Sequence, residues 1–149
     1  MSYASLLSEG RIRAQTFAPR ELERFVLAAE AKLGDAGIEG HTDDTTFVLA
    51  YDAVRTAAEA VMAAEGYRPT SGEGQHAAVF EFLEETESGR WADDAREFDR
   101  ARKKRNVSQY ERFGLITETQ ADELRASARV FVGEVRDWLD ERGLLSPGD

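Results

Sequence analysis

Apolar residues recur at helical spacing over most of the chain. In residues 19–34, 42–66 and 117–143 they fall three and four places apart, so each segment has one apolar face and predicts an amphipathic helix. The last of these segments opens with Thr117 and Gln120, a capping-box pattern. The positions predicted to face inward are Leu22, Phe25, Val26, Ala29, Leu33, Phe47, Tyr51, Val54, Ala58, Val61, Ala121, Leu124, Ala128, Phe131, Val135 and Trp138.

Two further segments complete the predicted fold. Residues 75–85 are short and apolar on one side, and a longer helix is predicted from about Ala92 into the basic residues 102–105. The stretch between Gly66 and the short helix, YRPTSGEG, is predicted to be a loop because it contains Pro69 and two glycines. No alternating pattern typical of a strand has a useful length. The sequence therefore predicts an all-α fold, an up-and-down bundle of four main helices plus a short additional helix.

The length of 149 residues is that of one ordinary domain, and no internal linker divides it. We therefore expect a single helical domain over residues 1–149, with its core at about 18–143 and frayed ends. The N-terminal residues are too polar for a signal peptide, and no apolar run reaches the ~20 residues of a membrane span. These features predict a cytoplasmic protein that does not cross a membrane.

The amino-acid composition excludes several kinds of functional site. The formal net charge is −10, so nucleic acid is repelled on average and phosphate binding would need a local basic patch. The absence of cysteine excludes disulfides and thiolate nucleophiles. The two histidines, His41 and His76, are far apart and lack the spacing of metal ligands. We expect no metal site and no cofactor.

One basic patch is present in the stretch RKKRNVSQYE, residues 102–111, and it has two interpretations. Acidic residues begin the predicted helix and cations end it, which suits the helix dipole without any function. Alternatively, the cations bind phosphate. At ~100° per residue Arg102, Asn106 and Tyr110 share one face, whereas Arg105 and Tyr110 diverge by about 140°. The last two converge only if the helix bends or ends near Val107, or if two copies of the chain share the site.

The chain resembles the HEPN domain family over about residues 45–136. The resemblance is carried by AYDAVRTAAEAVMAAEGYRP, by GEGQHAAVFEFL and by KKRNVSQYE before a long last helix. The family signature is an Arg, usually followed by a polar residue such as Asn, four to six residues before a His. Arg105 and Asn106 match the first part, and Tyr110 stands at the position of the His.

The resemblance implies a homodimer that cleaves or binds RNA without a metal, in a toxin–antitoxin setting. By this resemblance Arg105 holds the phosphate, Asn106 orients the site and Tyr110 occupies the acid–base position. The cations expected to contact nucleic acid are Arg102, Lys103 and Lys104. Tyr titrates near ~10 and His near ~6.5, so the change from His weakens base catalysis at neutral pH. The alternative is a non-catalytic helical dimer or adaptor that binds a protein partner such as a nucleotidyltransferase.

Other polar residues have simpler interpretations beside functional ones. His76 is predicted to be a partly exposed residue at a helix start, with a replacement catalytic base as the alternative. Glu59 is predicted on a solvated helix face, unless it is packed against an Arg of the basic helix. Asp93 and Asp94 are predicted to interact with a helix dipole rather than with a metal. His41 is predicted to lie in a loop or cap.

Overall fold

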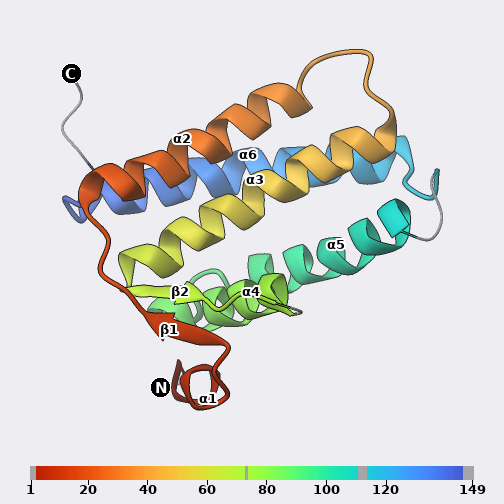
Figure 1. Ribbon diagram of the computed structural model, residues 1–149. Helices are drawn as coiled ribbons and strands as arrows, with labels where there is room; N and C mark the ends of the chain where they lie inside the picture. The colour runs from red at the N-terminus through yellow and green to blue at the C-terminus, as the bar shows by residue number, and fades with distance from the viewer. Residues whose placement is uncertain (1–2, 73, 111–113, 146–149) are drawn as a thin grey trace.

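The structure is a computed structural model that describes residues 3–72, 74–110 and 114–145, except for the side chains of residues 109 and 110. The elements are α1 (Tyr3–Ser8), β1 (Ile12–Ala14), α2 (Pro19–Ala36), α3 (Asp43–Ala64), β2 (Tyr67–Pro69), α4 (Gln75–Glu85), the 3-10 helix η1 (Thr86–Gly89), α5 (Ala92–Tyr110) and α6 (Glu118–Glu141). The all-α prediction is confirmed, and the four long helices are α2, α3, α5 and α6 (Figure 1).

Two of the long helices, α3 and α6, begin at a threonine whose side chain accepts a hydrogen bond from a backbone N–H group. The side chain of Thr42 accepts a hydrogen bond from the Thr45 N–H at the start of α3. At the start of α6, Thr117 and Gln120 form the predicted capping box, with bonds of 3.0 and 3.1 Å. Pro19 occupies the first turn of α2.

The central element of the fold is α3. It packs against α2 and α6 on one side and against α4 and α5 on the other (Figure 1). Because many of its residues are alanine, neighbouring helices can approach it closely, and almost every non-charged position from Ala50 to Ala63 is buried. Polar side chains on α3 therefore also lie between packed elements.

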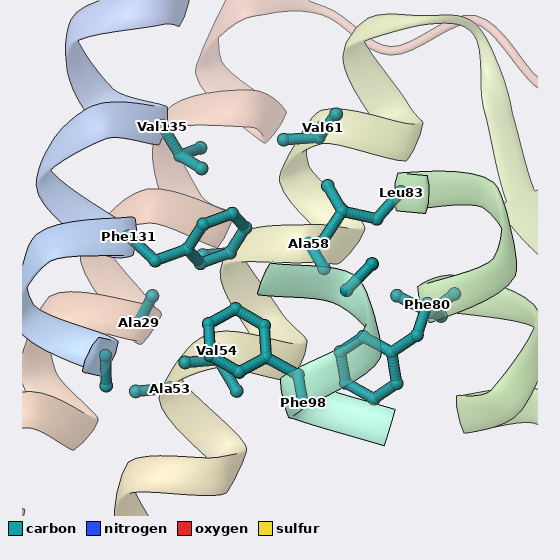
Figure 2. Close-up of a cluster of buried hydrophobic side chains, with 14 of the residues drawn as sticks. Ala29, Ala53, Val54, Ala58, Val61, Phe80, Leu83, Phe98, Phe131 and Val135 are labelled. Carbon is teal, nitrogen blue, oxygen red and sulfur yellow. The ribbon is translucent and has the colours of Figure 1, made fainter. Parts of the chain in front are cut away.

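Aromatic side chains fill the space between α3 and its neighbours. Phe98 of α5 and Phe131 of α6 pack edge to face with ring centroids 5.0 Å apart, beside Val54 and Ala58 of α3 (Figure 2). The inward-facing positions predicted from periodicity are buried with two exceptions. Phe25 and Leu33 of α2 are only partly buried, because they lie at the edge of the core.

A small sheet and the packed N-terminal segment were not predicted. Strands β1 and β2 pair antiparallel, with Ile12 opposite Pro69, so part of the predicted loop 67–74 is a strand. Each strand has only three residues, too few for an alternating pattern to be visible in the sequence. Leu6 of α1 and Ile12 are buried in the core, which therefore begins before residue 18.

One end of the bundle is held together by Asp44. This buried residue in the first turn of α3 accepts hydrogen bonds from the Ser108 hydroxyl of α5 and from the Gly114 N–H, the latter at 3.2 Å. The contact links the end of the basic helix to the start of α3. α5 continues past Val107 and Ser108 to Tyr110, so the helix does not end near Val107.

Charged pairs lie on the outside of the bundle. The guanidinium of Arg136 on α6 binds both carboxylate oxygens of Glu30 on α2, at 2.7 and 2.8 Å. Such exposed pairs add little to stability individually, and this one links α6 to α2. None of the helices in the described ranges combines the length and the apolar character that crossing a membrane requires.

Candidate functional site

The side chain of Arg105 is directed toward the centre of the bundle. Its guanidinium carbon lies 5.6 Å from the centre of the Tyr51 ring of α3, a cation–π contact. Its Nη1 also donates to the Asn106 side-chain oxygen at 3.2 Å. Asn106, to which the family resemblance assigns an orienting role, thus contacts the guanidinium group directly.

The same tyrosine contacts a histidine on a third helix. The Tyr51 hydroxyl lies 3.0 Å from Nδ1 of His76, the second residue of α4. Tyr51 itself is fully buried, whereas His76 and Arg105 are each partly exposed. One buried aromatic ring therefore brings together Arg105 of α5 and His76 of α4, and both are partly open to solvent.

The surroundings of His76 keep its imidazole neutral. Burial lowers the pKa of His76 to about 4, helped by the positive charges of Arg55, Arg105 and Arg102, while Asp52 opposes the shift. Burial also raises the pKa of Tyr51, so its hydroxyl stays protonated. The hydrogen bond between the two therefore joins a neutral phenol to a neutral imidazole, and the tautomer of His76 decides which of them donates.

Three charged residues follow Tyr51 along α3, namely Asp52, Arg55 and Glu59. Arg55 forms an ion pair with Glu59 one turn later, and a second of its nitrogens lies 4.0 Å from Asp52. The Arg55 Nε is buried and has no hydrogen-bond acceptor in the part of the chain that the structure describes. Buried donors are nearly always satisfied, so this N–H is an exception among the described residues.

The prediction for Glu59 was wrong. Its side chain is only 16% exposed rather than on a solvated helix face. The reason is that α3 is the central helix, so both of its sides are covered. The partner of Glu59 is Arg55 on the same helix and not an Arg of α5. Burial raises the pKa of Glu59, and the positive charge of Arg55 opposes that shift.

Two of the other basic residues have partners on their own helix. Arg102 Nε donates to Asp99 at 2.8 Å, and Lys103 lies 3.6 Å from the same carboxylate. Lys104 is partly buried. The helix-dipole interpretation of these cations does not hold, because the last turn of α5 contains no basic residue. Arg102 and Lys103 pair instead with Asp99, which would compete with phosphate for both. Tyr110 ends α5, but its side chain lies outside the described residues, so its convergence with Arg105 stays a prediction.

Helical spacing predicted Tyr51 as a core residue, and nothing in the sequence connected it with the basic stretch. A buried tyrosine normally needs a hydrogen-bond partner, and that need was the available signal. His76 does lie partly exposed at a helix start, as predicted, and the fold brings it to the arginines. His41 is exposed in the segment just before α3.

Two predictions concerned metals and helix-start acids. Asp93 and Asp94 occupy the first turn of α5, where Asp93 pairs with Arg96. Within the described ranges, no group of three or more His, Asp or Glu residues is arranged to hold a metal ion.

No protein-family model, curated protein or solved structure matches the chain. A function must therefore be inferred from the chemistry of the residues around Tyr51.

Proposed function

We propose that this protein binds RNA at the arginines around Tyr51 and cleaves it without a metal ion. The observation that supports this most is that two residues contact the buried Tyr51. Arg105 lies over its ring, and His76 lies within hydrogen-bond distance of its hydroxyl. A guanidinium that stays charged and an imidazole that stays neutral at pH 7 are two of the groups that metal-free cleavage of RNA needs, beside an acid for the leaving oxygen. The resemblance to HEPN domains, with Arg105 and Asn106 in its motif, points to the same chemistry.

The reaction is an internal transfer at phosphorus. The 2′-oxygen of a ribose forms a bond to the neighbouring phosphorus, and the bond from phosphorus to the 5′-oxygen of the next nucleotide breaks. His76, as the tautomer whose Nδ1–H donates to the Tyr51 hydroxyl, takes the proton of the 2′-hydroxyl on its free Nε2, and Tyr110 gives a proton to the leaving 5′-oxygen. The products are a 2′,3′-cyclic phosphate and a 5′-hydroxyl, so neither water nor another reactant is consumed. Arg105 offsets the negative charge that builds on the phosphate oxygens.

Phosphate binding adjusts the proton affinity of His76. The free imidazole is a weak base because Arg55, Arg102 and Arg105 disfavour its protonation. A phosphodiester held by these arginines places a negative charge beside the ring, which raises its pKa toward the ordinary value near ~6.5. His76 therefore becomes a better base when substrate is present. Tyr110, at the family's acid–base position, has a hydroxyl suited to protonating the leaving 5′-oxygen.

The remaining cations position the strand. In this proposal Lys103 and Lys104 contact phosphates next to the scissile one, and Arg102 exchanges Asp99 for phosphate. Because the chain carries a net charge of −10, binding depends on these local contacts and weakens as salt rises. Asn106 acts as a positioning residue through its hydrogen bond with Arg105.

The test is cleavage of a single-stranded RNA in excess chelator by the wild type, Arg105→Ala and His76→Ala. We expect the wild type to leave 2′,3′-cyclic phosphate ends. Loss of Arg105 should reduce the rate about 10²–10³-fold, and loss of His76 about 10²–10⁴-fold. Arg24→Ala, at an exposed arginine on α2, is the control and should cleave at the wild-type rate.

Intact RNA with the wild type would overturn this proposal. Cleavage that survives in both Arg105→Ala and His76→Ala would do so as well, because it would place the chemistry elsewhere. In either case the non-catalytic homodimer or adaptor predicted from the sequence becomes the leading interpretation. The mass of the protein in solution and capture of a co-expressed nucleotidyltransferase then test it.

A further inference from the structure

A cavity of about 240 Å³ lies between the sheet and the helices, next to the cluster around Tyr51. Its walls come from the segment joining β1 to α2, from α2, α3 and β2, and from the first residue of α4. Two of its lining residues adjoin residues of the site around Tyr51. Gln75 lines the cavity and precedes His76, while Glu59 lines it and forms the ion pair with Arg55.

Three of the walls are aromatic. Phe17 and Phe25 pack edge to face, with ring centroids 5.9 Å apart, and both are only partly buried. Tyr67 forms another wall and packs against Tyr3 and Phe82, each with its ring centre 5.7 Å away. Aromatic walls held in place by further aromatic rings favour a flat, unsaturated ligand that can stack on them.

The polar groups of the cavity are few and distinct. The carboxylate of Glu59 accepts from Arg55 through Oε2, while Oε1 accepts no hydrogen bond from any residue in the described ranges. Arg68 also lines the cavity, and its Nη1 donates to Gln15 at 3.3 Å, while Gln75 supplies a second amide. An ionised carboxylate only accepts hydrogen bonds, so Glu59 selects a ligand that has N–H donors on one edge.

The size of the cavity limits the ligand. Pockets for drug-sized molecules span ~300–1,000 Å³, so this smaller cavity suits a single flat ring system rather than a whole nucleotide. A sugar and phosphate attached to such a ring would have to lie outside, toward solvent or toward the neighbouring arginines.

We propose that this cavity binds one planar nitrogen heterocycle of the nucleobase class, stacked among Phe17, Phe25 and Tyr67, with its N–H edge on Glu59. The proposal goes beyond RNA cleavage, because binding of such a ring requires no reaction. Guanine presents two neighbouring N–H donors on one edge and should bind best. Uracil presents a single N–H between two carbonyl oxygens, which a carboxylate repels, and should bind worst.

The test is titration of the whole protein with guanosine, adenosine, cytidine and uridine, followed by calorimetry and by saturation-transfer NMR. We expect guanosine to bind and uridine to bind at least tenfold more weakly. Glu59→Gln and Phe17→Ala should each weaken guanosine binding about tenfold or more, since each removes one hydrogen-bonded or stacked contact. Glu141→Gln, at an exposed position on α6, is the matched control and should bind as the wild type does.

Two sources of the ring are distinguished by ligands of different length. Free guanosine tests the cavity alone, and a short guanine-containing oligonucleotide whose 2′-hydroxyls are replaced by hydrogen tests a base carried on a strand. If the strand is the source, Arg102→Ala weakens binding of the oligonucleotide and leaves that of guanosine unchanged. If the free heterocycle is the source, the oligonucleotide gains nothing over guanosine.

The inference is overturned if no nucleoside binds at millimolar concentration, or if Glu59→Gln and Phe17→Ala both bind guanosine as the wild type does. Because Glu59→Gln also alters the ion pair with Arg55, Phe17→Ala provides an independent result from the outer wall of the cavity. Guanosine binding without RNA cleavage would uphold this inference and overturn only the proposed function. Cleavage without nucleoside binding would do the reverse.

Discussion

The hydroxyl of Tyr51 lies 3.0 Å from Nδ1 of His76, and this contact joins the middle of α3 to the start of α4. The two residues are 25 positions apart in the chain. Arg105 of α5 lies over the face of the same tyrosine ring. A neutral imidazole and a permanent cation are thereby held near each other at the surface of an otherwise acidic protein.

The pKa of His76 is the first testable consequence. Burial and three nearby arginines lower it to about 4. We predict that the imidazole Cε1 proton of His76 titrates with a midpoint near 4 in NMR spectra of the free protein. Arg105→Ala should raise that midpoint, because it removes one of the positive charges. Arg24→Ala, distant in sequence and exposed, is the control. A midpoint between 6 and 7 (about the ordinary value) in the wild type would contradict the prediction.

The same shift makes stability depend on pH. The unfolded chain binds a proton at His76 below its ordinary pKa of about 6.5, whereas the folded chain does so only near 4. The contribution of neutral His76 is therefore fully present above pH ~6.5 and is lost as the pH falls toward ~4. We predict that His76→Gln loses less unfolding free energy than the wild type over this range in urea titrations.

The control for that experiment is His41→Gln, which alters an exposed histidine just before α3. It should retain the wild-type difference between the two ends of the range. Identical pH dependence in the wild type and His76→Gln would show that His76 carries no such shift.

Removal of the Tyr51 hydroxyl tests the contact with His76 separately from the contact with Arg105. Tyr51→Phe keeps the ring beneath Arg105 but deletes one hydrogen bond, which typically contributes about 0.5–1.5 kcal/mol. We predict a loss of that order in the free energy of unfolding, together with a changed chemical shift for His76. Tyr67→Phe is the matched variant on β2 and should leave the His76 signal in place.

Asp44 should matter more for stability than its neighbour Asp43. Both lie in the first turn of α3, but only Asp44 is buried, where it accepts hydrogen bonds from Ser108 and Gly114. Asp44→Ala leaves these donors unpaired and should cost about 1–3 kcal/mol. Asp43→Ala removes only an exposed charge near the helix dipole and should cost no more than about 1 kcal/mol. Equal losses in chemical denaturation would refute the role of Asp44.

Much of the fold could be predicted from the sequence, because the spacing of apolar residues that indicates a long helix lies within the helix itself. The seam of α6 and its cap at Thr117 are both readable from spacing and residue type. The strands β1 and β2 could not be predicted, since three residues carry no period and their pairing joins Ile12 to Pro69 across much of the chain. Tertiary contact, and not local propensity, creates that sheet.

The candidate site was predictable only in part. Arg105 and Asn106 are neighbours, and their combination is visible in the sequence. The role of Tyr51 was not visible, because its position in the apolar seam of α3 explains the ring and leaves the hydroxyl unexplained. The same limit applies to Glu59, whose burial follows from the central place of α3 in the bundle. Periodicity says which face of a helix is covered, but not which polar atoms meet there.

The central claim is that His76 and the arginines form a single phosphate site. It is tested most directly by the NMR titration of His76 with and without a saturating RNA oligonucleotide whose 2′-hydroxyls are replaced by hydrogen. Such a strand keeps its phosphates and resists cleavage. We predict that binding raises the pKa of His76 from about 4 toward its ordinary value, because phosphate offsets the charges of Arg55, Arg102 and Arg105. A strand that does not bind, or that binds and leaves the titration of His76 unchanged, would contradict the claim.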